Sequence, residues 1–556
     1  MISTFKLKFG RATGLPGEAV SATPMTIFVG PNNSGKSKAL REIEHYCRTG
    51  HGQATDVILD TVTFSGLSLQ EADSALTRLI QPPNQGESLN AGNVIVGSRQ
   101  GRMQIQPDRF KAAVQNPAAN LPLFCQWYLA HRTLRLDGKN RLALVDSQPG
   151  GDLQRPGHST FQVLFNDDET RNEVRRIVYD AFGSYFVIDP TDLGKLRIRL
   201  SSRAPASNLE ERGIHADAVR FHREALTVDE ASDGVKAFIG IVTELLAGDP
   251  QILLIDEPEA FLHPSLSSKL GQEVARAALR ANKRVFVATH SPQFVMGCIQ
   301  SGVPLNVIRL TYRSGQSTAR LLPSPAILPL MRNPLLRSTN VIGGLFYEFV
   351  VVTESDSDRA FYQEINERLL RGRPNWGIPN CLFLNAQNKQ TIHTVLKPLR
   401  QLGIPAVAIV DVDVIKEGGS VWSALLSGAG IPEISLQALA TLRSAINLAM
   451  NNTSMDMKRD GGVEILQPPE REAALNLFQQ LADYGIFVVS GGELESWLTA
   501  LGATGHGPQW LISIFEKMGD EPGAVGYVEP ADDDVWAFVG RVASWLTDAN
   551  RKGIPA

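Results

Sequence analysis

The stretch MTIFVGPNNSGKS, residues 25–37, decides how the first half of this 556-residue chain folds. Its apolar start predicts a buried strand, and KSKALREIEHYC, from Lys36, predicts a helix. Between them GPNNSGKS matches GxxxxGK[ST], in which glycines let backbone N–H groups converge on phosphates at a helix N-terminus. We therefore expect an α/β domain built around a phosphate-binding loop.

The loop predicts an ATP site with Mg²⁺ as its companion. Lys36 is expected to reach the β- and γ-phosphates, and the Ser37 hydroxyl to bind the cation. A chance match in a glycine-rich turn is the alternative. The expected nucleotide-binding residues of the loop are Gly30, Asn32, Asn33, Ser34, Gly35, Lys36 and Ser37.

A second segment, ILLIDEPEAFLHP (residues 252–264), supplies acidic groups to the same site. Four apolar residues predict a buried parallel strand that carries Asp256 to its carboxyl end, where it would hold Mg²⁺. Glu257 would polarise the attacking water. The alternative is an acidic pair that caps a helix.

DEPEAFLHP and the later ATHSP resemble the Walker B–D-loop and H-loop of ABC-type ATPases, the group that includes SMC and RecF proteins. The resemblance implies that His290 contacts the γ-phosphate. It also implies a signature loop in EASDGVKAF, with Ser232 and Gly234 binding the nucleotide of a second copy, hence a homodimer or higher oligomer through the ATPase domains. Asp233 stands where glycine is commoner, and a plain helix cap is the alternative. Gln126 is the candidate for the glutamine loop.

Carboxylates gather at predicted strand ends in the second half of the chain. In VVVTESDSD a predicted strand ends at Glu354. In AVAIVDVD a second strand ends near Asp411 and Asp413, and in IFVVSGGELES a third ends before Glu493 and Glu495. A period of two places both aspartates of DVD on one side, and the GGELES pair is expected to repeat this geometry. Crowded carboxylates repel unless a cation neutralises them, which predicts one or two Mg²⁺ or Mn²⁺ ions. The expected metal ligands are Glu354, Asp358, Asp411, Asp413, Glu493 and Glu495.

A strand-end glutamate followed by DxD resembles the Toprim domain of topoisomerases, primases and OLD (overcoming lysogenization defect) nucleases. Toprim domains usually carry glycine after the glutamate, where this chain has Ser355. The resemblance makes Glu354, Asp411 and Asp413 catalytic, and adds Lys517, on an expected helix, as a catalytic lysine. Lys389 is a second candidate; for both lysines an ordinary surface role is the alternative. A solvated turn is the alternative for DxD.

The fold class expected is α/β: an ABC-type phosphate-loop ATPase domain followed by a smaller, Rossmann-like Toprim domain with a helical insertion. The expected boundaries are 1–325 for the ATPase, 326–344 for a proline-rich linker and 345–556 for the Toprim domain.

Composition is that of an ordinary globular protein, 43% hydrophobic and 20% charged, with a formal net charge of -4. The net charge gives no sign of a nucleic-acid-binding protein, so DNA would have to bind through a local basic patch or through a metal ion. Four scattered cysteines fit a reducing cytoplasm and exclude a zinc ribbon. No apolar run is long enough to predict a membrane span.

An ABC-type ATPase followed by a Toprim domain is similar to OLD-family nucleases, including the Gabija anti-phage nuclease subunit. The resemblance implies an ATP-regulated, metal-dependent DNA endonuclease in anti-phage defence or DNA processing, with RNA as an alternative substrate and a second defence-system subunit as a candidate partner. Two alternatives are a sensor or scaffold ATPase whose Toprim domain is inactive or cuts RNA, and a topoisomerase or primase.

Overall fold

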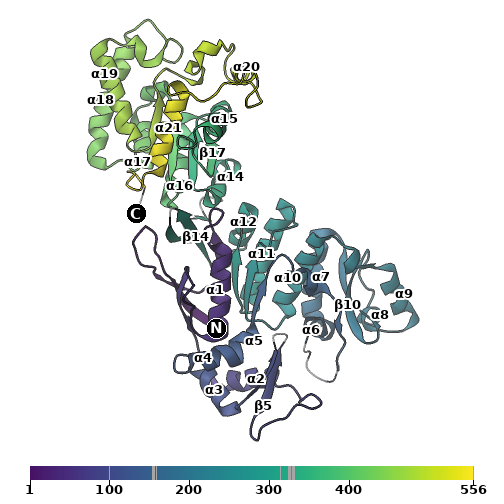
Figure 1. The fold of residues 1–556 in the computed structure, drawn as a ribbon. Coiled ribbons are helices and arrows are strands. Elements are labelled where there is room, and N and C mark those ends of the chain that lie inside the picture. The colour runs from purple at the N-terminus through teal and green to yellow at the C-terminus, as the bar shows by residue number, and fades with distance from the viewer. Residues whose placement is uncertain are drawn as a thin grey trace. The chain divides into compact units, whose positions relative to one another are not determined.

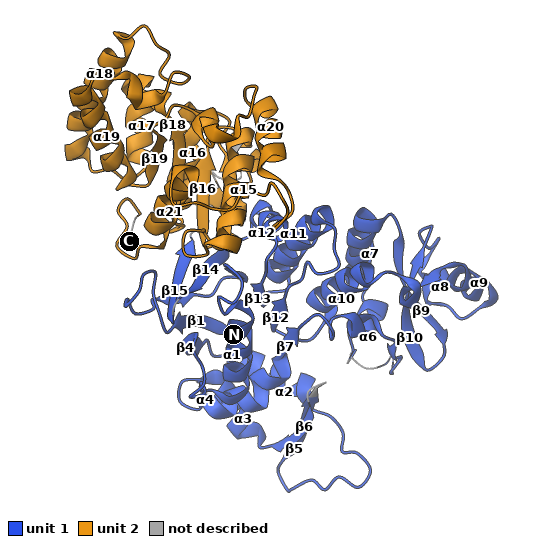
Figure 2. Cartoon of the chain, turned by 45° about the horizontal axis from the view of Figure 1, so that its top comes forward, with its two compact units in different colours: residues 1–326 blue, residues 327–556 orange. Residues whose placement is uncertain are grey.

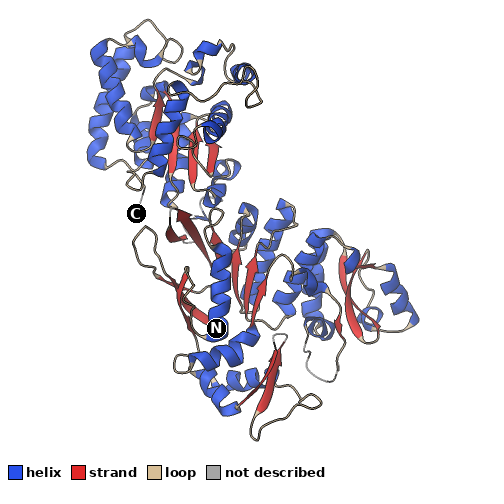
Figure 3. Ribbon diagram, in the orientation of Figure 1, coloured by secondary structure: helices blue, strands red, loops and turns tan. Residues whose placement is uncertain are grey.

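The computed structural model describes residues 1–98, 101–152, 154, 157, 159–313, 315–322, 327–328 and 332–554. The chain forms two compact units, residues 1–326 and 327–556, coloured separately in Figure 2. Each unit combines helices with a mainly parallel sheet, as the colouring of Figure 3 shows. Both units therefore have the α/β fold that the sequence predicts.

A six-stranded sheet forms the centre of the first unit (Figure 1). Its strands, in spatial order, are β15 (Gln316–Leu322), β14 (Leu305–Arg313), β3 (Met25–Val29), β13 (Arg284–Ala288), β12 (Ile252–Asp256) and β7 (Thr133–Leu136). All neighbours are parallel except β14 and β15. Nearly every residue of β3, β12 and β13 is buried, because strands covered on both faces need apolar side chains at successive positions.

Helices and a small antiparallel sheet cover this centre. The sheet consists of β2 (Ala19–Ser21), β1 (Ile2–Leu7) and β4 (Leu59–Phe64). The helices nearest the phosphate loop and the Walker B strand are α1 (Lys36–Thr49), α10 (Asp233–Ala247), α11 (Pro264–Arg280) and α12 (Pro292–Gln300). Phe5 of β1 meets Phe286 of β13 edge-on with ring centroids 5.7 Å apart, so the small sheet shares the core.

Two segments are inserted between the strands of the central sheet. The first comprises α2 (Leu69–Leu79), β5 (Val94–Ser98), β6 (Gly101–Ile105), α3 (Pro107–Gln115), α4 (Leu121–Phe124), the π-helical turn η1 (Cys125–Leu129) and α5 (Ala130–Arg132). The second comprises η2 (Leu142–Val145), β8 (Gln148–Pro149), α6 (Thr160–Asn166), α7 (Asp168–Phe182), β9 (Tyr185–Asp192), β10 (Lys195–Ser201), α8 (Asn208–Arg212), α9 (Ala216–Glu224), β11 (Leu226–Thr227) and η3 (Val228–Glu230).

The second unit contains a four-stranded sheet in which all strands are parallel. Their spatial order is β17 (Cys381–Asn385), β16 (Phe349–Thr353), β18 (Ala406–Asp411) and β19 (Ile486–Val489). The helical insertion predicted before the last strand is confirmed. It consists of η6 (Val412–Lys416), α17 (Gly419–Gly428), α18 (Glu433–Asn451), η7 (Gly462–Ile465) and α19 (Pro468–Ala482).

The remaining helices of this unit surround the sheet. They are α14 (Pro334–Ser338), η4 (Val341–Phe346), α15 (Asp356–Gly372), η5 (Lys389–Thr391), α16 (Ile392–Gln401), η8 (Leu494–Ser496), η9 (Thr499–Leu501), α20 (Pro508–Met518) and α21 (Asp534–Thr547). The stretch 326–344, predicted as a linker, includes α14 and the start of η4, while 326 and 329–331 lie outside the described residues. Within the described part of the chain, no helix has both the length and the apolar composition that a bilayer span requires.

One buried arginine ties the second unit together. The Arg400 guanidinium is 1% exposed and donates to the carbonyl oxygens of Ala406 (2.7 Å), Ala429 (2.5 Å), Tyr484 (2.8 Å) and Gly553 (3.4 Å). These carbonyls belong to β18 and to three turns. A single side chain thus joins the insertion and the C-terminal segment to the sheet.

We expect Arg400→Met to lower the free energy of unfolding of this unit by about 3 kcal/mol or more, because each buried acceptor left without a donor costs roughly 1–3 kcal/mol. Chemical denaturation followed by tryptophan fluorescence measures the loss. The matched control is Arg371→Met on α15, where the exposed arginine pairs with Glu367 at 3.8 Å and removal should cost less than about 0.5 kcal/mol. Equal losses for the two variants would contradict the prediction.

Candidate functional site

The phosphate-loop sequence folds into a tight turn between β3 and α1. Gly30 and Gly35 have φ angles of +142° and +95°. A Cβ on Gly30 would lie 2.0 Å from the Leu310 carbonyl oxygen, so only glycine fits there. Helix α1 begins at Lys36, directly after the turn, and its first N–H groups have no partner within the helix. The turn therefore has the shape and the donors that bind phosphate groups.

Lys36, the predicted phosphate ligand, lies where this turn meets α1. The buried Lys36 ammonium donates to the carbonyl oxygens of Gly30 (2.8 Å) and Pro31 (2.7 Å). Burial lowers the pKa of Lys36 to about 8. Ser34 is buried beside it, whereas Asn32 and Asn33 are exposed.

The two predicted Mg²⁺ ligands of this half touch each other, although 219 positions separate them in the chain. The Ser37 hydroxyl donates to Asp256 Oδ1 over 2.8 Å. A hydroxyl and a carboxylate are hard oxygen ligands of the kind that Mg²⁺ prefers. With the turn and Lys36, they fit a nucleotide and its cation.

Glu257 and His290 lie next to this pair of ligands. His290 Nε2 is 3.8 Å from Glu257 Oε1, and burial together with Lys36 lowers the pKa of His290, which favours the neutral imidazole. Glu257 has a φ of +50°, an uncommon angle for a residue with a side chain. The buried Arg141 stabilises it by donating to the Glu257 carbonyl oxygen at 2.5 Å. Arg141 was not predicted from sequence, because nothing in DGKNRLALVD marks it.

The predicted signature residues lie at the start of α10. Ser232 is the N-cap residue, and its side chain makes no capping hydrogen bond, so the helix-cap interpretation is not supported for Ser232. Gly234 packs against the Phe261 backbone, where a Cβ would approach the carbonyl oxygen to 2.5 Å. Gln126 is exposed in the π-helical turn η1.

In the second unit, the carboxyl ends of β16 and β18 bring three predicted ligands together. Ligand oxygens of Glu354, Asp411 and Asp413 lie within 4.8 Å of one another. The prediction that Asp413 continues the strand is wrong, because β18 ends at Asp411 and Asp413 lies in the 3-10 turn η6. The turn redirects the backbone and still leaves both aspartates beside Glu354.

Glu354 and Asp411 are in direct contact. The Asp411 backbone N–H donates to Glu354 Oε1 at 3.0 Å. Burial and the neighbouring carboxylates raise the pKa of Glu354 to about 8, and burial raises that of Asp411 to about 7. Asp358, in the first turn of α15, accepts the Ser355 N–H at 2.9 Å, and burial raises its pKa too. Ser355, which replaces the usual glycine, serves as the helix cap.

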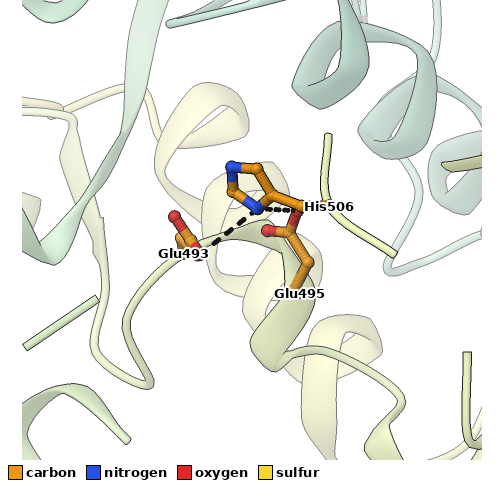
Figure 4. A group of neighbouring side chains, drawn as sticks. All are labelled: Glu493, Glu495 and His506. Carbon is orange, nitrogen blue, oxygen red and sulfur yellow. Dashed lines mark ion pairs between the residues drawn. The ribbon is translucent and has the colours of Figure 1, made fainter. Parts of the chain in front are cut away.

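A second acidic group lies after β19 (Figure 4). His506 Nδ1 is 2.9 Å from Glu495 Oε1 and 3.7 Å from Glu493 Oε1. The prediction that both glutamates extend the strand is wrong: β19 ends at Val489, and Glu495 lies in the 3-10 turn η8. His506 was missed, since a lone histidine eleven residues after Glu495 gives no signal in one sequence.

Lysines neutralise part of this negative charge. Lys389 Nζ is 2.6 Å from Asp413 Oδ2, close to the cluster as its candidate role requires. Lys458, which sequence reasoning missed, is 2.7 Å from Asp411 Oδ2 and 3.3 Å from Glu493 Oε2. Lys517 is exposed on α20, and no ion pair joins it to the carboxylates among the described residues.

The donor set fits a hard divalent cation. All the acidic ligands offer carboxylate oxygen, the preferred ligand of Mg²⁺ and Mn²⁺. Asp413 Oδ1 is buried without a hydrogen-bond partner in the described structure, and buried polar oxygens rarely remain unpaired. Glu354, Asp411 and Asp413 are therefore the residues that could hold such an ion.

Comparison with known proteins gives two family matches. Residues 135–296 match the family described as "AAA domain, putative AbiEii toxin, Type IV TA system". Residues 345–413 match "Overcoming lysogenization defect protein-like, TOPRIM domain". No curated protein matches the chain.

Solved structures similar to the chain include SMC head domains. One, bound to the C-terminal winged-helix domain of ScpA, is 14% identical with a TM-score of 0.32, covering 58% of this chain and 97% of its own. The SMC head of Thermotoga maritima is 11% identical with a TM-score of 0.28, covering 58% and 98%. That of Pyrococcus furiosus, bound to a ScpA C-terminal domain, is 12% identical with a TM-score of 0.29, covering 60% and 99%.

The fold and the two sites define a phosphate-loop ATPase joined to a Toprim domain. The order of the two matched families, an ATPase domain first and an OLD-like Toprim domain second, is that of an ATPase–Toprim fusion.

Loss of either key Walker residue should stop ATP turnover. We expect Lys36→Ala to lower nucleotide affinity and Glu257→Gln to keep nucleotide binding while reducing the turnover rate by about 100-fold or more. Phosphate release and binding of a fluorescent ATP analogue separate the two effects. Lys38→Ala, which removes an exposed lysine of the same helix, serves as control, and ATP hydrolysis at the normal rate by Glu257→Gln would contradict the prediction.

The raised carboxyl pKa values predict how the stability of the metal-free protein changes with pH. Glu354 titrates near 4.5 when unfolded and near 8 when folded, so between these values the folded state holds more protons. Its contribution to the free energy of unfolding therefore falls as pH rises through this window. Thermal melts in EDTA should show a smaller fall for Glu354→Gln than for the wild type, with Glu367→Gln, at a half-buried position of α15, behaving as wild type. An unchanged pH profile in Glu354→Gln would exclude this origin.

Proposed function

We propose that the protein is an ATP-regulated, divalent-metal-dependent DNA endonuclease that nicks or cleaves its substrate. In this proposal residues 1–325 bind and hydrolyse ATP, and residues 345–556 cut the phosphodiester. The observation that carries it is the convergence of Glu354, Asp411 and Asp413 to within 4.8 Å. Three carboxylates this close, two of them with raised pKa values, are costly to fold unless they bind cations.

The nuclease site would act through its carboxylates. Glu354, Asp411 and Asp413 would hold the cation, with Asp358, Glu493 and Glu495 as further ligands. Bound Mg²⁺ or Mn²⁺ supplies an activated water and stabilises the leaving oxygen. Lys389, at 2.6 Å from Asp413 Oδ2, keeps that carboxylate oriented. Lys517, exposed on α20, would be the catalytic lysine that approaches the phosphodiester when DNA binds.

The ATPase site would use Lys36 and the loop N–H groups to hold the phosphates, and Ser37 with Asp256 to hold Mg²⁺. Glu257 would accept a proton from the attacking water, with His290 3.8 Å away oriented towards the γ-phosphate. Ser232, whose hydroxyl caps no helix N–H, and Gly234 would bind the nucleotide of a second copy. Dimerisation through the ATPase domains follows from this arrangement.

The biological setting that we propose is the cytoplasm, where the four free cysteines remain reduced. Similarity in domain order to the Gabija nuclease subunit supports a role in anti-phage defence, with a second subunit of such a system as partner. DNA processing outside defence is the alternative setting.

We expect Asp411→Ala to abolish cleavage of supercoiled plasmid by at least about 100-fold, because it removes a central ligand of the proposed cation. ATP hydrolysis by the same variant should continue. Plasmid and single-stranded RNA are incubated side by side with Mg²⁺, Mn²⁺ or EDTA, with and without ATP. Retained nicking by Asp411→Ala would overturn the proposed site, and cutting of RNA alone would favour the RNA-directed alternative.

A further inference from the structure

The loop between α18 and α19 brings a cation into the carboxylate cluster. Lys458 Nζ lies 2.7 Å from Asp411 Oδ2, 3.3 Å from Glu493 Oε2 and 3.9 Å from Asp413 Oδ2. The three carboxylates come from β18, from η6 and from the turn after β19. One ammonium group thus lies at the point where three separate segments converge.

Hydrogen bonds and close packing fix the backbone of the loop that carries Lys458. The Lys458 N–H donates to Asp456 Oδ1 at 2.8 Å, and the Asp456 N–H donates to Asp460 Oδ2 at 2.6 Å, which closes the loop. Gly492 allows the loop to lie against the turn after β19, since a Cβ there would be 2.1 Å from the Lys458 carbonyl oxygen. The position of the ammonium is therefore set by packed backbone at both ends.

A single ammonium does not balance the charge of the cluster. Lys389 and Lys458 are the lysines paired with its six carboxylates in the described structure. Within the same residues, no ion pair reaches Glu354, and Asp413 Oδ1 has no hydrogen-bond partner. A divalent ion would supply the charge that the lysines leave uncompensated.

An ammonium and a metal ion compete for these oxygens. Lysine has three N–H donors and no lone pair, so it cannot become a ligand, and two positive charges a few ångströms apart repel. Lys458, at 2.7 Å from Asp411 Oδ2, occupies space and lone-pair directions that a cation would use there. The occupant with the greater charge displaces the other when its concentration is high enough.

We propose that Lys458 is a positioning residue of the metal site. In the metal-free enzyme its ammonium keeps Asp411 and Glu493 converged, and it leaves Asp411 when a divalent cation binds. The insertion loop between α18 and α19 thereby sets the cation concentration at which the site fills. This inference rests on the proposed function, because it takes the carboxylates to be the metal ligands.

The test is calorimetric titration of Mn²⁺ into the full-length protein without nucleotide. We expect Lys458→Met, which keeps the side-chain length and removes the charge, to bind Mn²⁺ about tenfold more tightly or better than the wild type. Lys458→Arg should stay close to the wild type. Lys397→Met, which removes an exposed lysine of α16 in the same unit, should change nothing. Asp411→Ala identifies the isotherm that belongs to the cluster.

A second readout is thermal stability. In EDTA, Lys458→Met should melt below the wild type, because Asp411 and Glu493 then face each other without a counter-ion, and Mn²⁺ should raise its melting temperature more than that of the wild type. A merely structural role would weaken Mn²⁺ binding or leave it unchanged, and cannot tighten it. Equal or weaker binding by Lys458→Met, with normal binding by the wild type, overturns the inference alone. If neither the wild type nor any variant shows Mn²⁺ binding that Asp411→Ala removes, both the inference and the proposed metal site are overturned.

Discussion

Repulsion among carboxylates at one edge of the β17–β16–β18–β19 sheet is the constraint on which the second unit depends. Parallel strands end at a common edge, so Glu354, directly after β16, meets Asp411, at the end of β18. Folding the chain into this sheet therefore has an electrostatic cost: burial, together with the neighbouring carboxylates, raises the pKa values of Glu354 and Asp411. Lys389 and Lys458 offset part of the cost, and the remainder favours a bound cation.

In the first unit, backbone geometry places the charged groups of the nucleotide site. Its sheet also delivers ligands to one edge, where Ser37 meets Asp256 at 2.8 Å. Here the positive partner is preformed, since the N-terminus of α1 and Lys36 face the position of the phosphates. Arg141 stabilises the uncommon backbone angle of Glu257 by donating to its carbonyl oxygen, so the carboxylate remains next to His290. Strain of this kind persists only where neighbouring groups hold it, and it concentrates at functional sites.

The helical insertion links sheet topology to the chemistry of the site. It begins with η6, which contains Asp413, and returns to the sheet at β19, and its loop around Lys458 reaches the carboxylate edge. Gly492 and the Asp456 turn place Lys458 there, and Arg400 fixes the turn after α17 to β18. An insertion that the sequence shows only as amphipathic helices thus contributes a charged group to the centre of the site.

The sequence by itself determined the local parts of this protein: the phosphate loop, the buried strands that end at Asp256, Glu354 and Asp411, and the two α/β units. These follow from apolar runs and glycine spacing, which act over a few residues. Tertiary structure alone decided that Asp413 and Glu495 reach their sites from 3-10 turns and not from strands, and that Lys458 and His506 lie beside them. In the first unit it decided likewise that Arg141 contacts Glu257. Their positions depend on how distant backbone segments pack, and a single lysine, histidine or arginine in a loop carries no periodic pattern from which that packing can be deduced.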